Sequence, residues 1–214
     1  AERSCLMRIS SIPATMNGAA EFQVANVLAA ISACRAYGLP VRHLTFLQTF
    51  KNEEDNPGRN NLYRLNKGHA LIDYGHNPGA FAAICKMASL WRDKTVTGII
   101  GVPGDRDDRV IEEAARIAAH GFHRIILKED FDLRGREKGE VAKLLCATVN
   151  REAPDRSCEI ILDEIEAFEN ALGKITESDV VVIFYDKLAP VLEVLEKYRA
   201  VPVSYFEQTA VSGN

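Results

Sequence analysis

The segment 71–78, which reads Leu-Ile-Asp-Tyr-Gly-His-Asn-Pro, joins an apolar strand pattern directly to a helix pattern. Residues 70–72 suit a buried strand, and apolar residues recur at helical spacing after Pro78. A strand that passes straight into a helix directs free backbone N–H groups and the positive end of the helix dipole to the junction. The junction therefore predicts an anion site, for which phosphate is the natural ligand.

Strands and helices alternate after residue 58. A turn signal at 66–68 predicts a hairpin, and the other segments follow the periods of strands and helices. We expect strands at 62–65, 70–72, 96–102, 124–128, 159–162, 180–185 and 201–205, and helices at 109–120, 138–150, 164–172 and 189–198. This order predicts an α/β fold, a mostly parallel sheet with helices on both faces. Ligands bind such a sheet beyond the carboxyl ends of its strands, where polar residues gather here.

The first 58 residues have a different pattern. Helical spacing predicts a helix within 17–38 and a second short helix at about 41–50. Residues 51–58 are polar, contain Pro and Gly, and have no periodicity, which is typical of a domain boundary or hinge. Because residues 1–10 read as the interior of a protein and do not begin with Met, we expect the chain to be a fragment.

Composition argues against several classes of function. A net charge of -4 and a pI near 5.8 give no general attraction to nucleic acid or to an anionic membrane. No apolar run approaches the roughly 18 residues that a membrane span needs. The five cysteines are scattered and form no CxxC pair, which favours a reduced, cytoplasmic chain without a metal site. The oligomeric state stays open, including a homo-oligomer.

Two residues of the opening segment are candidates for ligand binding. Asp73, at the strand end, suits ribose hydroxyls, and its alternative is a carboxylate that caps a turn or helix. His76 has no Ser or Cys nearby in sequence and no second His at metal spacing. A role facing phosphate remains for His76.

Two later loops carry charge. Arg106, in the glycine-containing loop 101–108, is placed to meet an anion, unless this is only a capped surface loop. The loop 128–137 suits a cationic substrate through its carboxylates and a carboxylate or phosphate through its arginines. A self-neutralising surface loop explains the same charges. The charged residues concerned are Glu129, Asp130, Asp132, Arg134 and Arg136.

The motifs at 73–78, 104–107 and 56–59 together resemble the C-terminal domain of the Mur ligase family. Those enzymes join a carboxylate to an amine through an acyl phosphate formed from ATP. The resemblance implies a Rossmann-like domain at 59–207, a remnant of the central ATP-binding domain at 1–58 and a tail at 208–214. It also implies ATP and Mg²⁺ as cofactors, held mostly by a missing upstream part.

Residue roles follow from the same resemblance. Segment 21–30 is similar to a family helix near adenine, but Phe22 and Gln23 replace the usual His-Asn pair, so only Asn26 matches. Arg59 is implied to reach the nucleotide and Asp73 its ribose, whereas His76 with Arg59 neutralises phosphate charge in catalysis. The family loop for the amino-acid substrate lacks its Pro here. Its implied counterparts are Glu129, Asp130, Asp132, Arg134 and Arg136.

Within the family, the chain looks most like the enzyme that attaches arginine to the side-chain carboxylates of an aspartate polymer. Segments 11–15, 55–62, 101–106 and 128–136 carry this likeness. It implies arginine, the polymer and the missing domains of the same protein as partners. No GxxxxGK[ST] sequence occurs, so we expect the fragment alone to be inactive. The alternatives are a stand-alone, non-catalytic binding module and a Mur-type ligase for peptidoglycan or folate glutamylation.

Overall fold

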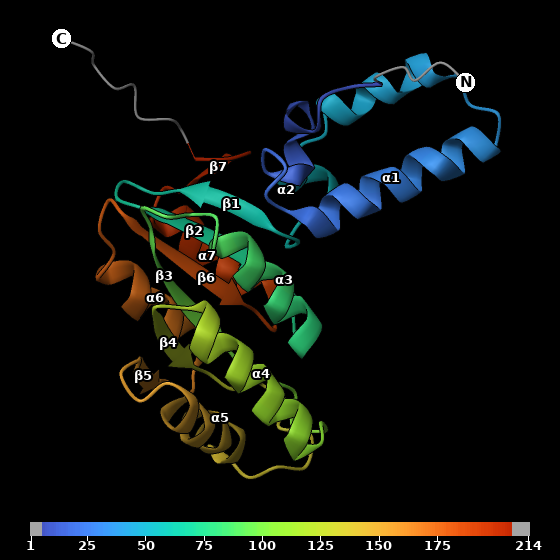
Figure 1. Cartoon of the computed structure of the whole chain (residues 1–214). Coiled ribbons are helices and arrows are strands. Elements are labelled where there is room, and N and C mark those ends of the chain that lie inside the picture. The colour runs from blue at the N-terminus through green and yellow to red at the C-terminus, as the bar shows by residue number, and fades with distance from the viewer. Residues whose placement is uncertain (1–5, 207–214) are drawn as a thin grey trace.

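The computed structural model describes residues 6–206, except for the side chains of residues 41–43. The expected tail at 208–214 lies outside these residues. A seven-stranded sheet with the order β5-β4-β3-β6-β2-β1-β7 forms the centre of the molecule (Figure 1). Its strands are β1 (Asn61–Arg64), β2 (His69–Asp73), β3 (Thr95–Ile100), β4 (Arg124–Leu127), β5 (Ser157–Ile160), β6 (Asp179–Phe184) and β7 (Val201–Val203).

The sheet is mostly parallel, as the sequence predicts. All neighbours from β5 to β2 pair in parallel, whereas β1 pairs antiparallel with β2 and with β7. The hairpin predicted around residues 66–68 is present in β1 and β2, where Leu62 pairs with Leu71. The carboxyl ends of the parallel strands consequently meet at one edge, where the polar loops lie.

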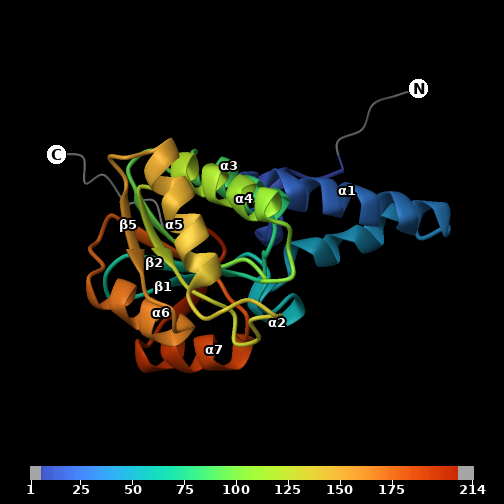
Figure 2. The ribbon, with the colours of Figure 1, turned by 90° about the horizontal axis from the view of Figure 1, so that it is seen from below.

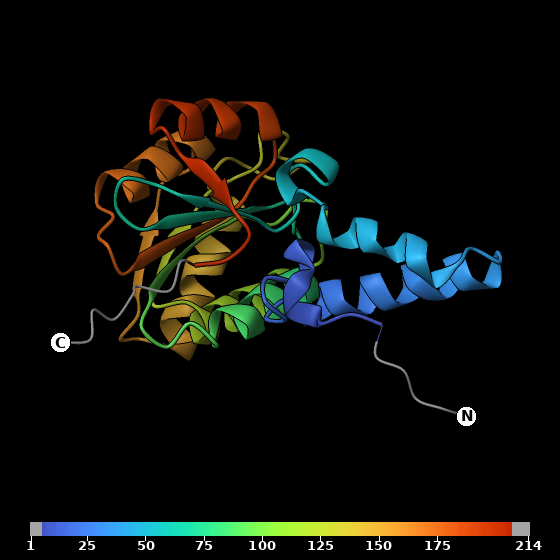
Figure 3. The ribbon, with the colours of Figure 1, turned by 90° about the horizontal axis from the view of Figure 1, so that it is seen from above.

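Helices cover both faces of the sheet (Figures 2 and 3). Residues of α3 (Pro78–Ala88), α4 (Asp108–Gly121) and α5 (Glu140–Glu152) share one core with Val180 and Val182 of β6. Residues of α6 (Glu164–Gly173) and α7 (Leu188–Lys197) share the other core with Val181 and Ile183. Successive side chains of β6 thus enter opposite cores, which explains why this strand is apolar throughout.

An arm projects from the sheet near β1 (Figure 1). It contains the 3₁₀ helices η1 (Ile9–Ser11), η2 (Pro13–Thr15) and η3 (Val41–Gln48) and the α-helix α1 (Glu21–Ala36). A small cluster that includes Ile12, Ile31 and Leu44 holds it together. At its base, Met16 and Ala20 join the core beneath α3.

The N-terminal region adds detail to what the sequence predicts. The second short helix, expected at about 41–50, is a 3₁₀ helix over 41–48. The polar segment 51–58 contains one helical turn, α2 (Asn52–Asp55). The amide of Asn61 organises it: its oxygen accepts from the Gly58 N–H at 2.6 Å, and its nitrogen donates to the carbonyl oxygens of Asn52 and Asn56. Hydrophobic periodicity does not register such side-chain bonds.

Two strand boundaries differ slightly from those expected. Strand β5 covers 157–160 instead of 159–162, and β7 ends at Val203 rather than at 205. Cys85, Cys146 and Cys158 pack partly buried against the core. Within residues 6–206, none of the helices is long and apolar enough to cross a membrane.

Candidate functional site

Asp73 connects the end of β2 to the segment before β1. Its Oδ2 accepts a hydrogen bond from the Asn60 N–H at 2.9 Å, and its Oδ1 accepts one from the Gly75 N–H at 2.7 Å. The residue is only 8% exposed, and burial raises the pKa of its carboxyl group against the lowering effect of these bonds and of Arg59. Asp73 therefore also acts as a carboxylate that caps a turn, which is the alternative role considered for it from the sequence.

A cavity of about 440 Å³ lies between α1 and the β2–α3 junction. Three residues predicted to contact nucleotide, Asn26, Arg59 and Asp73, line it together. Asn26 comes from α1 and donates a hydrogen bond to the Gln23 side chain at 3.1 Å. The complete lining is Phe22, Gln23, Asn26, Asn56, Arg59, Asp73, Ala80, Ala83 and Ile84.

The exposed side chain of Arg59 lies over an aromatic ring. Its guanidinium carbon lies 4.7 Å from the centroid of the Tyr74 ring. The preceding residue, Gly58, has φ +74°, and its carbonyl oxygen accepts a hydrogen bond from the Tyr185 hydroxyl at 3.0 Å. A side chain at Gly58 would collide with the Tyr185 hydroxyl, so glycine is required there on two grounds.

His76 lies in the turn before α3 and does not line the cavity of Asp73. Its Nδ1 is 3.1 Å from the Tyr74 carbonyl oxygen, and its ring packs edge-on against the Tyr74 ring. Asn77 caps α3 by accepting the Ala80 N–H at 3.0 Å. His76 instead lines a small cavity of about 40 Å³, together with Lys128, Asp130, Arg134 and Asp186 among others.

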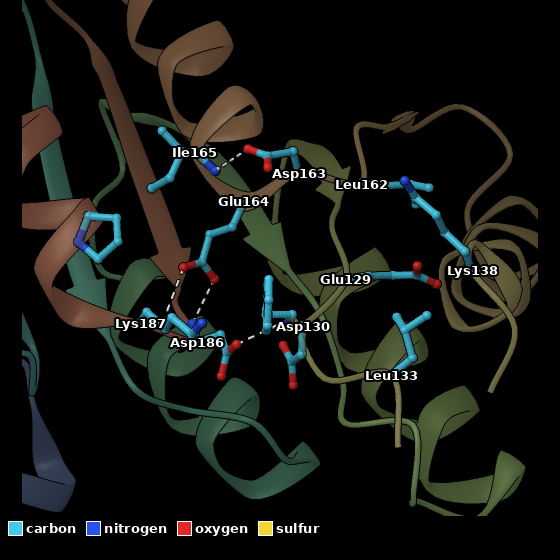
Figure 4. A pocket seen from close by; sticks show the side chains of 12 residues that line it. Glu129, Asp130, Leu133, Lys138, Leu162, Asp163, Glu164, Ile165, Asp186 and Lys187 are labelled. Atoms are coloured by element: carbon cyan, nitrogen blue, oxygen red, sulfur yellow. Dashed lines mark hydrogen bonds between the residues drawn. The ribbon is translucent and has the colours of Figure 1, made fainter. Parts of the chain in front are cut away.

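A larger, acidic cavity of about 470 Å³ lies beyond the ends of β4 and β6 (Figure 4). Five carboxylates and two ammonium groups line it, so its lining is negative on balance and suits a cation. Asp130 and Asp186 line both this cavity and the small one beside His76. The charged residues are Glu129, Asp130, Asp163, Glu164, Asp186, Lys138 and Lys187.

Lys128 organises the wall of the acidic cavity from behind. It is 1% exposed, and its Nζ lies 2.8 Å from Asp130 Oδ1 and 2.8 Å from Glu164 Oε2. Burial by itself lowers the pKa of Lys128, but Glu164 and Asp130 more than offset this, and the pKa lies above its usual value. The buried ammonium group therefore stays charged and fixes two carboxylates of the cavity.

Glu129 is the buried carboxylate on the other side of the cavity (Figure 4). It is 8% exposed, and its Oε2 accepts a hydrogen bond from the Gly139 N–H at 2.8 Å. Among the residues that the structure describes, no donor reaches its Oε1. Glu129 therefore has acceptor capacity left for a donor that enters beside it.

The remaining three predicted substrate residues do not line the acidic cavity. Asp132 is exposed and accepts a hydrogen bond from the Arg134 N–H, whose guanidinium pairs with Asp105 at 3.1 Å. Arg136 donates to the carbonyl oxygens of Gly104 and Arg106 and to two carboxylates. The alternative of a self-neutralising loop thus fits this part, and substrate binding by these three residues stays a prediction.

Sequence reasoning did not select Lys128, Glu164 and Asp186 as functional residues. Lys128 directly follows β4, Asp186 follows β6 closely, and Glu164 opens α6 and accepts the Asp186 N–H at 2.6 Å. Their position at strand ends was the available signal. It is weak, because single charged residues at strand ends are common on ordinary surfaces.

The donor groups differ in how well they fit the implied cofactors. The cavity of Asn26, Arg59 and Asp73 offers hydrogen-bonding groups and a cation, as one side of a nucleotide site needs. For Mg²⁺ the fit is poor, since the described part of the chain contains no group of three or more His, Cys, Asp or Glu side chains placed to hold a metal.

Comparisons with known proteins show what the chain is similar to. The family model described as "Mur ligase, glutamate ligase domain" matches residues 58–184. Cyanophycin synthetase of Synechocystis sp. is 40% identical over 192 residues, which cover 89% of this chain and 22% of that protein. The chain thus spans less than a quarter of the length of this relative.

Two further proteins are similar over most of the chain. UDP-N-acetylmuramoyl-L-alanyl-D-glutamate–2,6-diaminopimelate ligase of Bacillus cereus is 26% identical over 175 residues, covering 81% of this chain and 34% of that protein. The structure of E. coli FolC in complex with DHPP and ADP aligns with a TM-score of 0.59 and 19% identity, covering 81% of this chain and 39% of that one. At this identity the structural likeness shows the fold.

Proposed function

The chain belongs to the Mur ligase family through its glutamate ligase domain, and from this premise we propose that it forms the closing part of an ATP-dependent amide ligase similar to cyanophycin synthetase. The ligase joins arginine to the side-chain carboxylates of an aspartate polymer through an acyl phosphate. In this proposal residues 59–207 are the closing domain, 208–214 a tail, and 1–58 the end of the ATP-binding domain. The cyanophycin synthetase of Synechocystis sp. is the main support for this choice of substrates.

The observation that carries the proposal is the line of cavities along one sheet edge. The cavity of Arg59 and Asp73 lies on the nucleotide side, and the acidic cavity lies on the amine side. The small cavity with His76 lies next to the latter, because Asp130 and Asp186 line both. An amine held by these carboxylates would face a phosphate near His76, which is the proximity that amide formation requires.

On the nucleotide side, this chain's residues bind and neutralise charge. Asn26 contacts the adenine, and Asp73 accepts from a ribose hydroxyl with lone pairs not used by Asn60 and Gly75. Arg59 and His76 stabilise the negative charge of the phosphates. The ADP in the similar FolC structure supports a nucleotide at this fold.

On the amine side, the carboxylates hold the ammonium group and accept its proton. The free amine then attacks the acyl carbon, the bond from that carbon to the phosphate oxygen breaks, and phosphate leaves with the electron pair and takes up the second proton that the nitrogen loses. Asp130 and Asp186 are placed for the proton because they line both cavities. Closing the domain excludes water, which would otherwise hydrolyse the acyl phosphate.

Other parts of the site belong to another domain in this proposal. The 214 residues contain no GxxxxGK[ST] sequence, and within residues 6–206 no acidic cluster fits a metal. We therefore assign Mg²⁺ and most triphosphate contacts to a preceding nucleotide-holding domain of the same protein. The far greater length of the cyanophycin synthetase of Synechocystis sp. supports this assignment. The 214-residue chain alone should show no ligase activity.

An amine screen tests the proposal. The protein in its full genomic length is given ATP, Mg²⁺ and an aspartate polymer, with arginine, lysine, diaminopimelate or glutamate as amine, and phosphate release and amide formation are measured. Arginine-dependent turnover is expected. Preference for diaminopimelate would favour the peptidoglycan type of ligase, of which the Bacillus cereus relative is an example. Preference for glutamate would favour the folate type, and the absence of any turnover would favour a binding module.

A further inference from the structure

An exposed aromatic ring lies at the acidic cavity. Phe131 follows β4 closely, lines this cavity, and is 84% exposed. Its backbone is fixed, because the Phe131 N–H donates to Asp186 Oδ2 at 3.1 Å. A phenyl ring exposed to this extent gains little from packing within the chain. The ring therefore remains open to a ligand of the acidic cavity.

A cation already occupies the face of this ring. The Nζ atom of Lys187, another residue of the cavity, lies 3.7 Å from the centroid of the Phe131 ring. The negative face of an aromatic ring attracts a cation at this distance. Lys187 is itself exposed, and none of its contacts buries it. The ring thus presents a cation-binding face that is covered by an exposed side chain of the same protein.

We propose that Phe131 determines specificity by stacking on the planar guanidinium group of the arginine substrate, and that Lys187 covers this face while the cavity is empty. The inference rests on the proposed function. The carboxylates attract any cation, so charge alone does not separate arginine from lysine. A flat ring does separate them, because the planar, weakly hydrated guanidinium stacks on an aromatic face whereas a compact ammonium keeps its water.

The ring and the carboxylates recognise different parts of the substrate. Glu129 retains an acceptor oxygen without a donor, whereas Asp130 and Asp186 hold the reacting ammonium group. Glu129 accepts hydrogen bonds from the edge of the guanidinium, while Phe131 covers its face. Arginine entering the cavity displaces Lys187, which moves into solvent.

The test is a comparison of kinetic constants in the full-length ligase. Initial rates are measured for wild type, Phe131→Ala, Phe131→Trp and Lys187→Ala with arginine or lysine varied. Phe131→Ala should raise KM for arginine about five- to thirty-fold, the value of one cation–π contact. We expect kcat at saturating arginine and KM for ATP to stay within about twofold, since the ring takes no part in chemistry.

The other variants sharpen the comparison. Phe131→Trp keeps a ring face and should retain the wild-type KM for arginine within a few-fold. Lys187→Ala removes the competing cation and should lower KM for arginine. Phe46→Ala removes an exposed ring on the arm and serves as the matched control, with no expected change in KM for arginine. The kcat/KM ratio of arginine to lysine should fall only in Phe131→Ala.

Two results would overturn the assignment of Phe131. One is an unchanged KM for arginine in Phe131→Ala, and the other is an equal rise for arginine and lysine, which would mean a general packing role. Failure of the proposed function is seen separately, because wild type itself would then not use arginine. That outcome also removes the ligand on which the role of Phe131 depends.

Discussion

The carboxylate of Asp73 accepts the backbone N–H of Asn60 at 2.9 Å and thereby fixes the residue next to Arg59 against the end of β2. A second bond, from the Gly75 N–H, fixes the turn that carries His76. One side chain thus positions two candidate phosphate-binding residues. Any effect of replacing Asp73 on nucleotide binding therefore includes a contribution from the positions of Asn60 and Gly75.

Asp73→Asn should change how stability depends on pH. Burial raises the carboxyl pKa of Asp73 in the folded state above its ordinary 3.8. At a pH between the ordinary pKa and the raised pKa, the folded state therefore holds a proton that the unfolded state has released. The free energy of unfolding of wild type should therefore fall, relative to Asp73→Asn, as pH rises through this window. Urea unfolding from pH 3 to 7 measures the difference. A slope of opposite sign for Asp73→Asn would refute the burial argument.

Gly58→Ala should destabilise the fold much more than Gly135→Ala. Both glycines have positive φ, but a side chain meets the Tyr185 hydroxyl at Gly58 and nothing at Gly135. Gly135→Ala should cost about 1 kcal/mol for backbone strain alone. Gly58→Ala adds a steric conflict and should cost about 3 kcal/mol or more. Thermal or urea unfolding compares the two, and equal losses would mean that crowding at Tyr185 is unimportant.

Lys128→Met should cost about 3–5 kcal/mol, because it leaves Asp130 and Glu164 without their buried counterion. Adding Glu164→Gln should recover part of this loss, since the two residues share one interaction. The matched control is Lys174→Met, which removes the exposed partner of Glu159 and should change stability by less than about 0.5 kcal/mol. Urea unfolding at pH 7 measures all three, and strict additivity of the double variant would contradict the coupling.

Arg59→Ala should reduce ATP-dependent turnover of the full-length ligase at least about tenfold, as expected for loss of a charged phosphate contact. Its stability should change by less than about 0.5 kcal/mol, because the side chain is exposed. Arg59→Lys should not restore activity, since a compact ammonium replaces neither the fork of donors nor the guanidinium over the Tyr74 ring. Lys67→Ala removes an exposed cation from the β1–β2 turn as a control. Unchanged turnover in Arg59→Ala would rule out its nucleotide role.

The sequence predicts the sheet well, because a strand that packs against helices on both faces must be apolar at nearly every position. Val180 to Phe184 are apolar throughout, as a strand with helices on both sides must be. The sequence also allowed Asn26, Arg59 and Asp73 to be grouped as candidate nucleotide-binding residues, since they belong to recognisable motifs. The cluster around Lys128 was not, because it depends on Glu164, a residue far away in sequence that the strand order brings near. No periodicity or local motif encodes such a contact.

The base of the arm has a mechanical consequence. Residues Met16 and Ala20 pack into the core beneath α3, and Asn61 binds the carbonyl oxygens of the α2 segment to β1. The arm is consequently held to the sheet at two separate points. Asn26 on the arm and Asp73 on the sheet thus line one cavity without any rearrangement of the chain. A nucleotide that enters the cavity would find these two residues already in position, so little binding free energy would be spent on ordering them.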